Sequence, residues 1–276
     1  MSARKAFVVG WPIAHSRSPR IHRFWLKRHG IDGDYLPEAV QPNAIDGFLK
    51  DFAEKGYVGG NVTLPHKEAA FRACSSTTPV ARKLEAANTL WLEGGRLNGD
   101  NTDVYGFTAN LDDTAPEWRM GSTALVIGAG GASRAVLQAL IDAGYETVSL
   151  ANRTAARAEL LAKHFGGPVS AIGFDQLQTA VPEADLIVNA TSAGLHDDGS
   201  LDVPWRAAKK NAIATDLIYV PLVTPFLRDA SAAGLKIVDG LGMLLHQAVP
   251  GFGRWFGVRP VVDAELRDLI VADIKG

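Results

Sequence analysis

The stretch Ala124-Leu125-Val126-Ile127-Gly128-Ala129-Gly130-Gly131-Ala132-Ser133 decides the fold of this chain. Four apolar residues typical of a buried strand run directly into a glycine-rich turn, and the pattern from Ala132 to Ala143 is helical. Glycines at such a turn let the backbone approach a pyrophosphate, whose charge is favoured by the free N–H groups of the helix start. The stretch predicts a dinucleotide site, although Ser133 stands where the usual motif has a third glycine or alanine. The alternative is a plain glycine turn.

A regular alternation of strands and helices follows this turn. A helix is expected at Ala155–Phe165, and everything after Gly240 is expected to be helical, ending with Asp263–Ile274. The expected strands are 148–150, 186–188, 212–214 and 236–238, with a weaker one at 169–172. Strands that alternate with helices predict a parallel sheet covered on both faces.

Residues 1–103 indicate a second alternating α/β unit. Its expected strands are 6–9, 57–63 and 89–92, its expected helices begin near Pro19 and span 43–54, and a turn at 93–96 closes a hairpin. We expect the polar stretch Asp112–Arg119 to connect the two parts.

The composition excludes several classes of function. The chain has 276 residues, of which 47% are hydrophobic and 21% are charged, with a net charge of -2 and one cysteine, Cys74. This balance argues against nucleic acid or a membrane as a partner, and one cysteine excludes a disulfide framework. The seven histidines lack metal-ligand spacing, so we expect no metal site. We expect a soluble, cytoplasmic protein, and the sequence allows a homodimer without indicating one.

The next expected strand ends in Asn152-Arg153-Thr154, with Arg157 one helical turn later. An NAD site would usually place a carboxylate here for the ribose 2′-hydroxyl. Two guanidinium groups match a phosphate instead, which predicts NADP as the cofactor. The alternative is an asparagine helix cap followed by surface arginines.

Two segments point to a small polar substrate. Ser16 and Ser18 precede Pro19 at an expected helix start, where they could hold a carboxylate, or where Ser18 could serve only as the N-cap. Lys67 also falls in the first turn of an expected helix. The helix dipole is too weak to remove its proton, so Lys67 is suited to donating one to an alkoxide. The alternative is a surface lysine.

A polar cluster supports the reading of Lys67 as a site residue. Asn88 opens a strand, and Asn98–Asp103 ends the hairpin with polar side chains. Asp103 starts another helix, where its charge is favourable. Asparagine, aspartate and lysine together could bind vicinal hydroxyls.

These segments together resemble the shikimate dehydrogenase family. The matching motifs, which follow the order of the family, are 12–19, 61–67, 88–90, 101–103, 128–133, 152–154, 189–194 and 239–243. The resemblance covers nearly the whole chain. It implies reversible reduction of 3-dehydroshikimate to shikimate by NADPH, within aromatic amino-acid biosynthesis.

The resemblance also implies roles for residues. It gives Lys67 the acid/base role with Asp103 as its partner. Carboxylate binding falls on Ser16 and Ser18, and ring-hydroxyl contacts fall on Thr63, Asn88, Asp103, Tyr219 and Gln247. Cofactor contacts fall on Gly128, Ala129, Gly130, Gly131, Ala132, Asn152, Arg153, Thr154, Arg157, Thr191, Leu217, Gly240 and Met243.

The family's architecture is α/β with two domains. It implies a substrate domain of residues 1–103 plus 240–276, a Rossmann-type doubly wound NADP domain of 104–239, and an active site in the cleft between them.

Two departures from the family pattern affect cleft shape. Trp11 replaces a smaller or polar residue, and His66 replaces an aromatic residue before the lysine. The Ser16/Ser18 pair favours the shikimate-specific branch. The alternatives are a dual quinate/shikimate dehydrogenase and a non-catalytic sensor that binds NADP and a ligand on the same scaffold.

Overall fold

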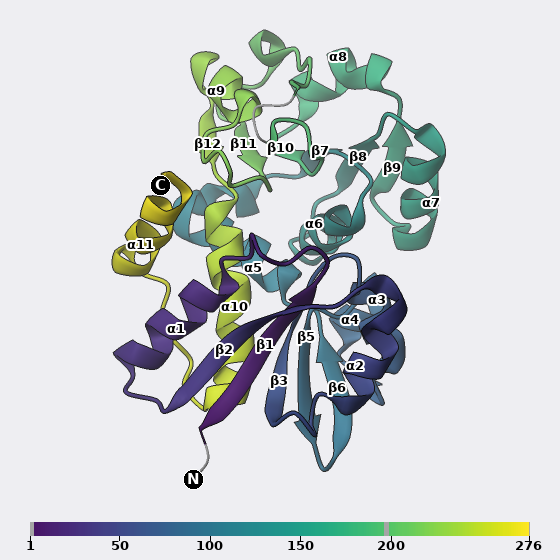
Figure 1. Ribbon diagram of the computed structural model, residues 1–276. Helices are drawn as coiled ribbons and strands as arrows, with labels where there is room; N and C mark the ends of the chain where they lie inside the picture. The colour runs from purple at the N-terminus through teal and green to yellow at the C-terminus, as the bar shows by residue number, and fades with distance from the viewer. Residues whose placement is uncertain (1–2, 196–198, 276) are drawn as a thin grey trace. The chain divides into compact units, whose positions relative to one another are not determined.

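The computed structural model describes residues 3–195 and 199–275 and divides into two compact units. Unit 1 contains the described residues up to Asp103 together with those from Leu245 onward, and unit 2 contains Val104–Leu244. Each unit is built around one sheet, as Figure 1 shows. The α/β fold predicted from the alternating pattern is confirmed.

Unit 1 has a mixed sheet. Its strand order is β2 (Gly33–Ala39), β1 (Arg4–Gly10), β3 (Tyr57–Val62), β5 (Thr89–Glu93), β6 (Arg96–Asp100) and β4 (Ser76–Thr77). β1 is parallel to β3, β5 is antiparallel to β3, and β6 is antiparallel to β5. The carboxyl ends of β1, β3 and β6 and the amino end of β5 therefore lie at the same edge of the sheet.

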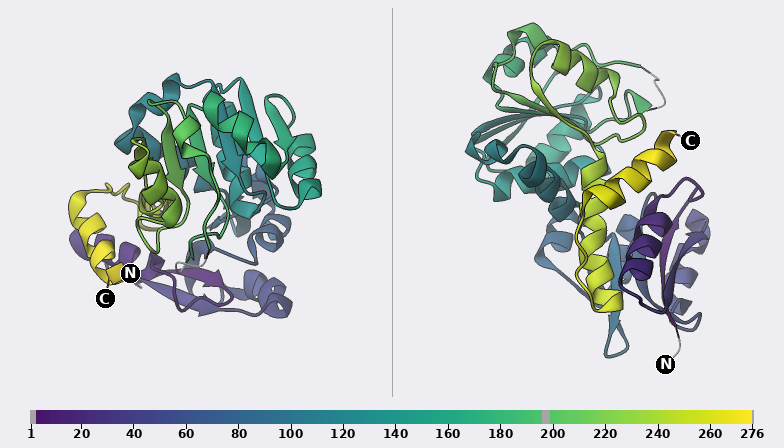
Figure 2. Two further views of the ribbon diagram at one scale, coloured as in Figure 1. Left: turned by 90° about the horizontal axis from the view of Figure 1, so that it is seen from above. Right: turned by 90° about the vertical axis from the view of Figure 1, so that its left-hand side faces the viewer.

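Hydrophobic side chains hold helices against both faces of this sheet. The helices of unit 1 are α1 (Ser18–Arg28), α2 (Ile45–Asp51), α3 (Lys67–Ala73), α4 (Pro79–Leu84), most of α10 (Leu241–Phe256) and α11 (Ala264–Lys275). One core contains Phe7, Phe48 and Phe52, whose rings meet edge to face. Another contains Trp25 of α1 and Phe252 of α10. Figure 2 shows α1 beside α11, where Asp273 pairs with Arg17 and Arg20.

Unit 2 has a fully parallel sheet. Its strand order is β12 (Lys236–Val238), β11 (Ile213–Asp216), β10 (Leu186–Asn189), β7 (Thr123–Ile127), β8 (Thr147–Ala151) and β9 (Val169–Ile172). Counted from β7 as the first strand, this is the 3-2-1-4-5-6 order of a doubly wound dinucleotide fold. Its helices include α6 (Gly131–Asp142), α7 (Ala155–Phe165), α8 (Leu177–Ala180) and α9 (Pro225–Ala232), which lie on the two faces of the sheet in Figure 2.

The polar stretch 112–119 is not the connector that its composition indicated. It lies within unit 2 as the end of α5 (Asp103–Thr114) and the start of a short helix, η2 (Pro116–Met120). Trp118 of this stretch is buried against Phe107 and Tyr145, and its indole N–H donates to Asp112. The apolar ring outweighs its polar neighbours because its burial removes a large area from water.

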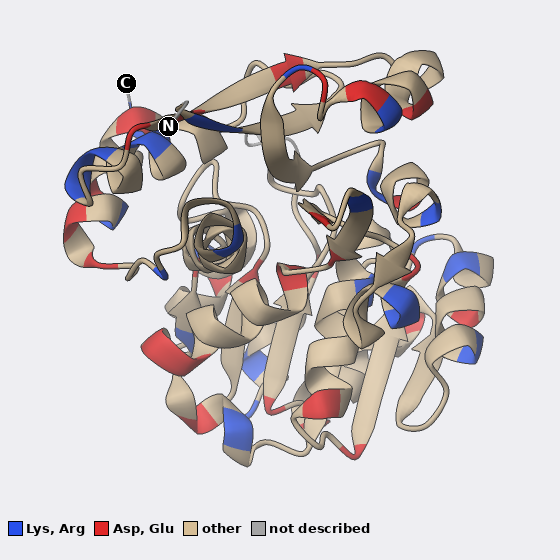
Figure 3. Ribbon diagram, turned by 90° about the horizontal axis from the view of Figure 1, so that it is seen from below, with Lys and Arg blue, Asp and Glu red and all other residues tan. Residues whose placement is uncertain are grey.

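Neither the charge distribution nor the helices of the described residues point to a membrane. Figure 3 shows Lys and Arg interspersed with Asp and Glu. Among residues 3–195 and 199–275, no helix has both the length and the apolar composition needed to cross a bilayer.

His22 on α1 makes the core of unit 1 sensitive to acid. Its ring is fully buried and stacks on Tyr35, with the ring centroids 3.9 Å apart. Burial lowers the pKa of His22 from 6.5 to about 3. Below pH 6.5 the unfolded chain therefore takes up a proton that the folded chain rejects, so the free energy of unfolding decreases as the pH falls toward 3.

We predict that His22→Phe flattens this decrease. Between pH 6 and 4, as a rough range, the free energy of unfolding of the parent should fall by roughly 1 kcal/mol per pH unit more than that of the variant. Urea unfolding at several pH values measures both slopes, and His29→Gln at the exposed end of the same helix is the control. Equal slopes for the parent and His22→Phe would contradict the prediction.

Candidate active site

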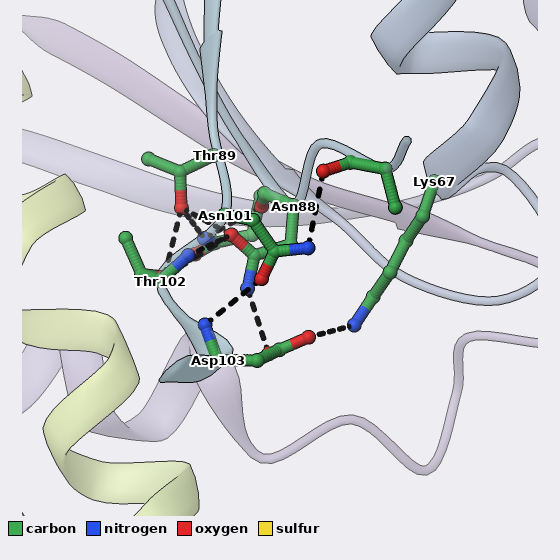
Figure 4. A network of polar contacts seen from close by, with 8 residues as sticks. Lys67, Asn88, Thr89, Asn101, Thr102 and Asp103 are labelled. Carbon is green, nitrogen blue, oxygen red and sulfur yellow. Dashed lines mark hydrogen bonds and ion pairs between the residues drawn. The ribbon is translucent and has the colours of Figure 1, made fainter. Parts of the chain in front are cut away.

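Lys67 and Asp103 meet at one edge of the unit 1 sheet. Lys67 opens α3 just after β3, and Asp103 opens α5 just after β6. Lys67 Nζ donates to Asp103 Oδ2 at 2.6 Å, and Figure 4 shows the two side chains pointing toward one another. A cation at a helix start opposes the helix dipole, whereas an anion there is favoured. The aspartate therefore compensates a lysine that its own helix destabilises.

The ion pair is only partly shielded from water. The side chain of Lys67 is 24% exposed and that of Asp103 is 14% exposed. A small molecule can therefore reach both groups, which would not be true of a fully buried structural pair. Lys67 is half-buried and paired, unlike the isolated surface lysine of the alternative reading.

Asn88 and Asn101 hold the aspartate in place. Asn88 Nδ2 donates to Asp103 Oδ1 at 2.8 Å, and Asn101 Oδ1 accepts from the Asp103 backbone N–H at 3.1 Å. The two carboxylate oxygens of Asp103 thus have separate partners, one an amide and the other an ammonium. These two bonds fix the orientation of the carboxylate.

The serine segment follows β1 and lies at the same edge. Ser18 is the first residue of α1, and its backbone N–H donates to Ser16 Oγ at 3.4 Å. Arg17 takes the N-cap position, so the alternative reading of Ser18 as the N-cap is wrong. Pro19 has no N–H, and the Arg20 N–H donates to Arg17 O at 3.0 Å. The serine hydroxyls are therefore the groups that this helix start offers to an anion.

Thr63 and Gln247 complete the set in unit 1, whereas Tyr219 belongs to unit 2. Thr63 is half-buried between β3 and α3, with its N–H donated to Val9 O at 2.9 Å. Gln247 is buried on α10. Tyr219 is half-buried just after β11. Of the predicted substrate residues, Asp103 thus binds both Lys67 and Asn88 directly. The others lie after strand ends or on helices.

The departure at His66 has a structural role. The ring is buried, and its Nε2 lies 2.7 Å from Val40 O, just beyond the end of β2. Since a carbonyl oxygen can only accept, Nε2 carries the proton. His66, which directly precedes Lys67, is thereby bonded to the segment that follows β2.

The glycine-rich turn of unit 2 has the shape that a pyrophosphate needs. Gly128 has φ +114°, and a Cβ there would lie 2.8 Å from Ala190 backbone atoms. A Cβ on Gly130 or Gly131 would meet nothing within 4 Å, so the space in front of the helix start is open. Ser133 is buried and accepts the Gly130 N–H at 3.1 Å, which shows how a serine fits the third position.

The end of β8 carries the two arginines. Arg153 and Arg157 are exposed, and neither has an ion-pair partner among the described residues. Asn152 Oδ1 accepts the Ala129 N–H at 3.1 Å, and its Nδ2 donates to Thr154 O at 2.9 Å. Asn152 therefore couples the glycine turn to the arginine segment. These residues fit a dinucleotide that bears a 2′-phosphate.

The remaining cofactor candidates also follow parallel strands. Thr191 follows β10, Leu217 follows β11, and Gly240 and Met243 follow β12. The carboxyl ends of parallel strands meet at one edge, which is where doubly wound folds bind their ligands.

Sequence reasoning missed the polar residues that shape this edge. Asn189 Oδ1 accepts both the N–H and the hydroxyl of Thr191, at 3.0 and 2.7 Å. Its Nδ2 donates to Asp216, a buried carboxylate whose pKa is raised by burial. Asn189 lies within the motif 189–194 that matches the family, but the motif alone does not show that its side chain binds Asp216.

Known proteins match the chain over nearly its full length. The family described as the shikimate dehydrogenase substrate binding domain matches residues 8–90, and the shikimate / quinate 5-dehydrogenase family matches residues 114–216. The NADP(+) shikimate dehydrogenase of Azorhizobium caulinodans is 56% identical over 272 residues, which cover 98% of this chain and 97% of the relative.

Two solved structures have the same fold. Shikimate 5-dehydrogenase of Thermus thermophilus, in complex with NADP(H) and shikimate, has a TM-score of 0.87 at 39% identity and covers 98% of this chain and 99% of its own. Quinate dehydrogenase of Corynebacterium glutamicum, in complex with NAD, has a TM-score of 0.91 at 25% identity and covers 99% of this chain and 100% of its own. The chain therefore belongs to the shikimate dehydrogenase family.

Proposed function

We propose that this chain catalyses the reversible reduction of 3-dehydroshikimate to shikimate with NADPH, a step of aromatic amino-acid biosynthesis. The observation that carries the proposal is the accessible Lys67–Asp103 pair, in a chain 56% identical to an NADP-dependent shikimate dehydrogenase. Bound NADPH supplies the hydride for the ketone carbon. The residues of this chain must bind the substrate, orient it and move one proton.

Lys67 moves that proton. In the reduction direction Nζ donates a proton to the ketone oxygen as the oxygen becomes a hydroxyl, and in the oxidation direction the amine takes the proton back. Asp103 holds the Lys67 ammonium in place through Oδ2. Because Asn88 donates to the other oxygen, the carboxylate cannot rotate freely away from the lysine.

The edge of unit 1 binds the rest of the substrate. Ser16 and Ser18 lie at a helix start and bind the carboxylate through their hydroxyl groups. The ring hydroxyls bind Thr63, Asn88, Asp103 and Gln247, and the family resemblance adds Tyr219 to this set. Loss of one such hydrogen bond in a site closed to water costs about 1–3 kcal/mol, so the set can distinguish polyols that differ by one hydroxyl.

Unit 2 binds the cofactor. The turn Gly128–Ala132 receives the pyrophosphate, and Asn152–Arg157 receive the 2′-phosphorylated ribose. Thr191, Leu217, Gly240 and Met243 line the strand ends beside them. In this division of labour, residues 1–103 and 240–276 form the substrate domain and residues 104–239 form the NADP domain.

We also propose that the enzyme is cytoplasmic and that it forms a homodimer. The identities favour shikimate over quinate as the substrate, because the quinate dehydrogenase is 25% identical to this chain whereas the shikimate dehydrogenase from Azorhizobium is 56% identical.

Replacing Lys67 by alanine should abolish most of the turnover. We expect kcat for shikimate oxidation to fall roughly 10²–10⁴-fold, the usual contribution of a general acid or base, while shikimate affinity changes far less. The reduction of NADP⁺, followed by absorbance, measures kcat, and calorimetry measures affinity. Lys50→Ala, at an exposed position of α2, is the control. A parent that binds both ligands without turnover would instead identify a sensor.

Replacing Arg153 and Arg157 by alanine should change cofactor preference. We expect KM for NADP⁺ to rise on the order of 10- to 100-fold for each lost charged hydrogen bond, and KM for NAD⁺ to stay nearly constant. Steady-state kinetics with both cofactors measure the effect, and Arg206→Ala, an exposed arginine elsewhere in unit 2, is the control. Equal losses with NADP⁺ and NAD⁺ would show that the two arginines do not read the 2′-phosphate.

A further inference from the structure

A series of hydrogen-bonded polar side chains leads from β2, an edge strand of the unit 1 sheet, to Asp103. It begins at Tyr35 on β2, whose ring is fully buried against His22. Burial raises the pKa of Tyr35 well above its usual value, so the phenol keeps its proton. The hydroxyl donates that proton to Asn61 Oδ1 at 2.6 Å.

The bond from Tyr35 fixes which way the Asn61 amide faces. Because Oδ1 is the acceptor, Nδ2 is the donor on the other side. Asn61 Nδ2 lies 3.0 Å from Asn88 O and 3.1 Å from Thr89 Oγ1, both of which can accept. The Thr89 hydroxyl therefore receives a hydrogen from Asn61 and has its own hydrogen left to donate.

Thr89 directs that hydrogen toward the amide that holds Asp103. Asn88 Oδ1 accepts from Thr89 Oγ1 at 2.9 Å. It also accepts from the backbone N–H of Thr102 at 2.8 Å and from the Thr102 hydroxyl at 3.1 Å. Figure 4 shows Thr89 and Thr102 on one side of Asn88 and Asp103 on the other. A flipped amide would place an NH₂ group against the Thr102 N–H and an oxygen against the carboxylate.

We propose that Thr89 is a positioning residue, the link by which the buried series Tyr35, Asn61 and Thr89 sets the orientation of the Asn88 amide. That orientation commits Asp103 Oδ1 to Asn88 and leaves Oδ2 for Lys67. Thr89 is fully buried and makes no direct contact with Asp103; its hydroxyl also lies 3.1 Å from the hydroxyl of Thr102, which binds the same Asn88 oxygen. The inference rests on the proposed roles of Lys67 and Asp103, and it assigns the orientation of that pair to residues outside the substrate's reach.

The test compares Thr89→Val, which keeps the shape but loses the hydroxyl, with Thr89→Ser, which keeps the hydroxyl. We expect Thr89→Val to lower kcat for shikimate oxidation on the order of three- to tenfold, with KM for NADP⁺ unchanged. Thr89→Ser should restore kcat to within about twofold of the parent, because the donor to Asn88 is present again. Equal kcat for Thr89→Val and the parent, or equal losses in the two variants, would overturn the proposal.

A second background separates positioning from general damage to the fold. In an Asn88→Ala protein the orientation to be set no longer exists, so adding Thr89→Val should cause no further loss of kcat. The same fold loss in both backgrounds would overturn the proposal. If Thr89→Val does not fold, Tyr35→Phe is measured in the same two backgrounds and decides by the same criterion.

The roles of Lys67 and Asp103 can fail separately from this inference. If Lys67→Ala retains the turnover of the parent, the proposed chemistry is wrong whatever Thr89 does. If Lys67→Ala is inactive and Thr89→Val is as fast as the parent, only the positioning role is wrong.

Discussion

The ion pair between Lys67 and Asp103 ties together the starts of two helices that lie 36 residues apart in the chain. The dipole of α3 opposes the cation at its start, whereas the dipole of α5 favours the anion at its start, so the aspartate offsets what the lysine loses. The sheet of unit 1 solves the problem by its topology. Two strands that run in the same direction, β3 and β6, end at one edge, and the antiparallel strand between them, β5, begins there just after Asn88. The ion pair depends on that register.

The hydrogen bonds around the ion pair fix the orientation of the Asn88 amide and, through it, of the Asp103 carboxylate. Every polar group of the Asn88 side chain has a partner of the correct type, so the amide cannot turn over without creating two repulsive contacts. The carboxylate oxygens are distinguished as a consequence. A site built in this way loses little free energy to reorganisation when a proton moves, because its dipoles already point where the charge will be.

Much of the fold followed from periodicity and glycine placement. The expected strands at 124–127 and 236–238 lie within β7 and β12, and the helix expected at Ala155–Phe165 is α7 itself. β2 was not anticipated, because Gly33-Asp34-Tyr35-Leu36-Pro37 lacks an alternating apolar pattern. Its strand character comes from parallel pairing with β1, which a local pattern cannot report. The burial of Trp118 is another such tertiary effect.

The candidate site was predictable in its residue types but not in its connections. Lys67, Asn88 and Asp103 could be chosen from helix starts, polar clustering and family resemblance. The roles of Tyr35, Asn61 and Thr89 could not, because a tyrosine or threonine in a strand is more often a packing residue than part of a network. Only the distances show that their hydrogen bonds end at Asp103.

The most direct test of the central claim is single-turnover hydride transfer in Lys67→Ala, Asp103→Asn and the double variant, measured by stopped-flow absorbance. Groups that act as one unit give non-additive losses, so the double variant should be about as slow as the slower single variant. Losses that multiply, or an Asp103→Asn variant as fast as the parent, would contradict the account, since the lysine would then work without its aspartate.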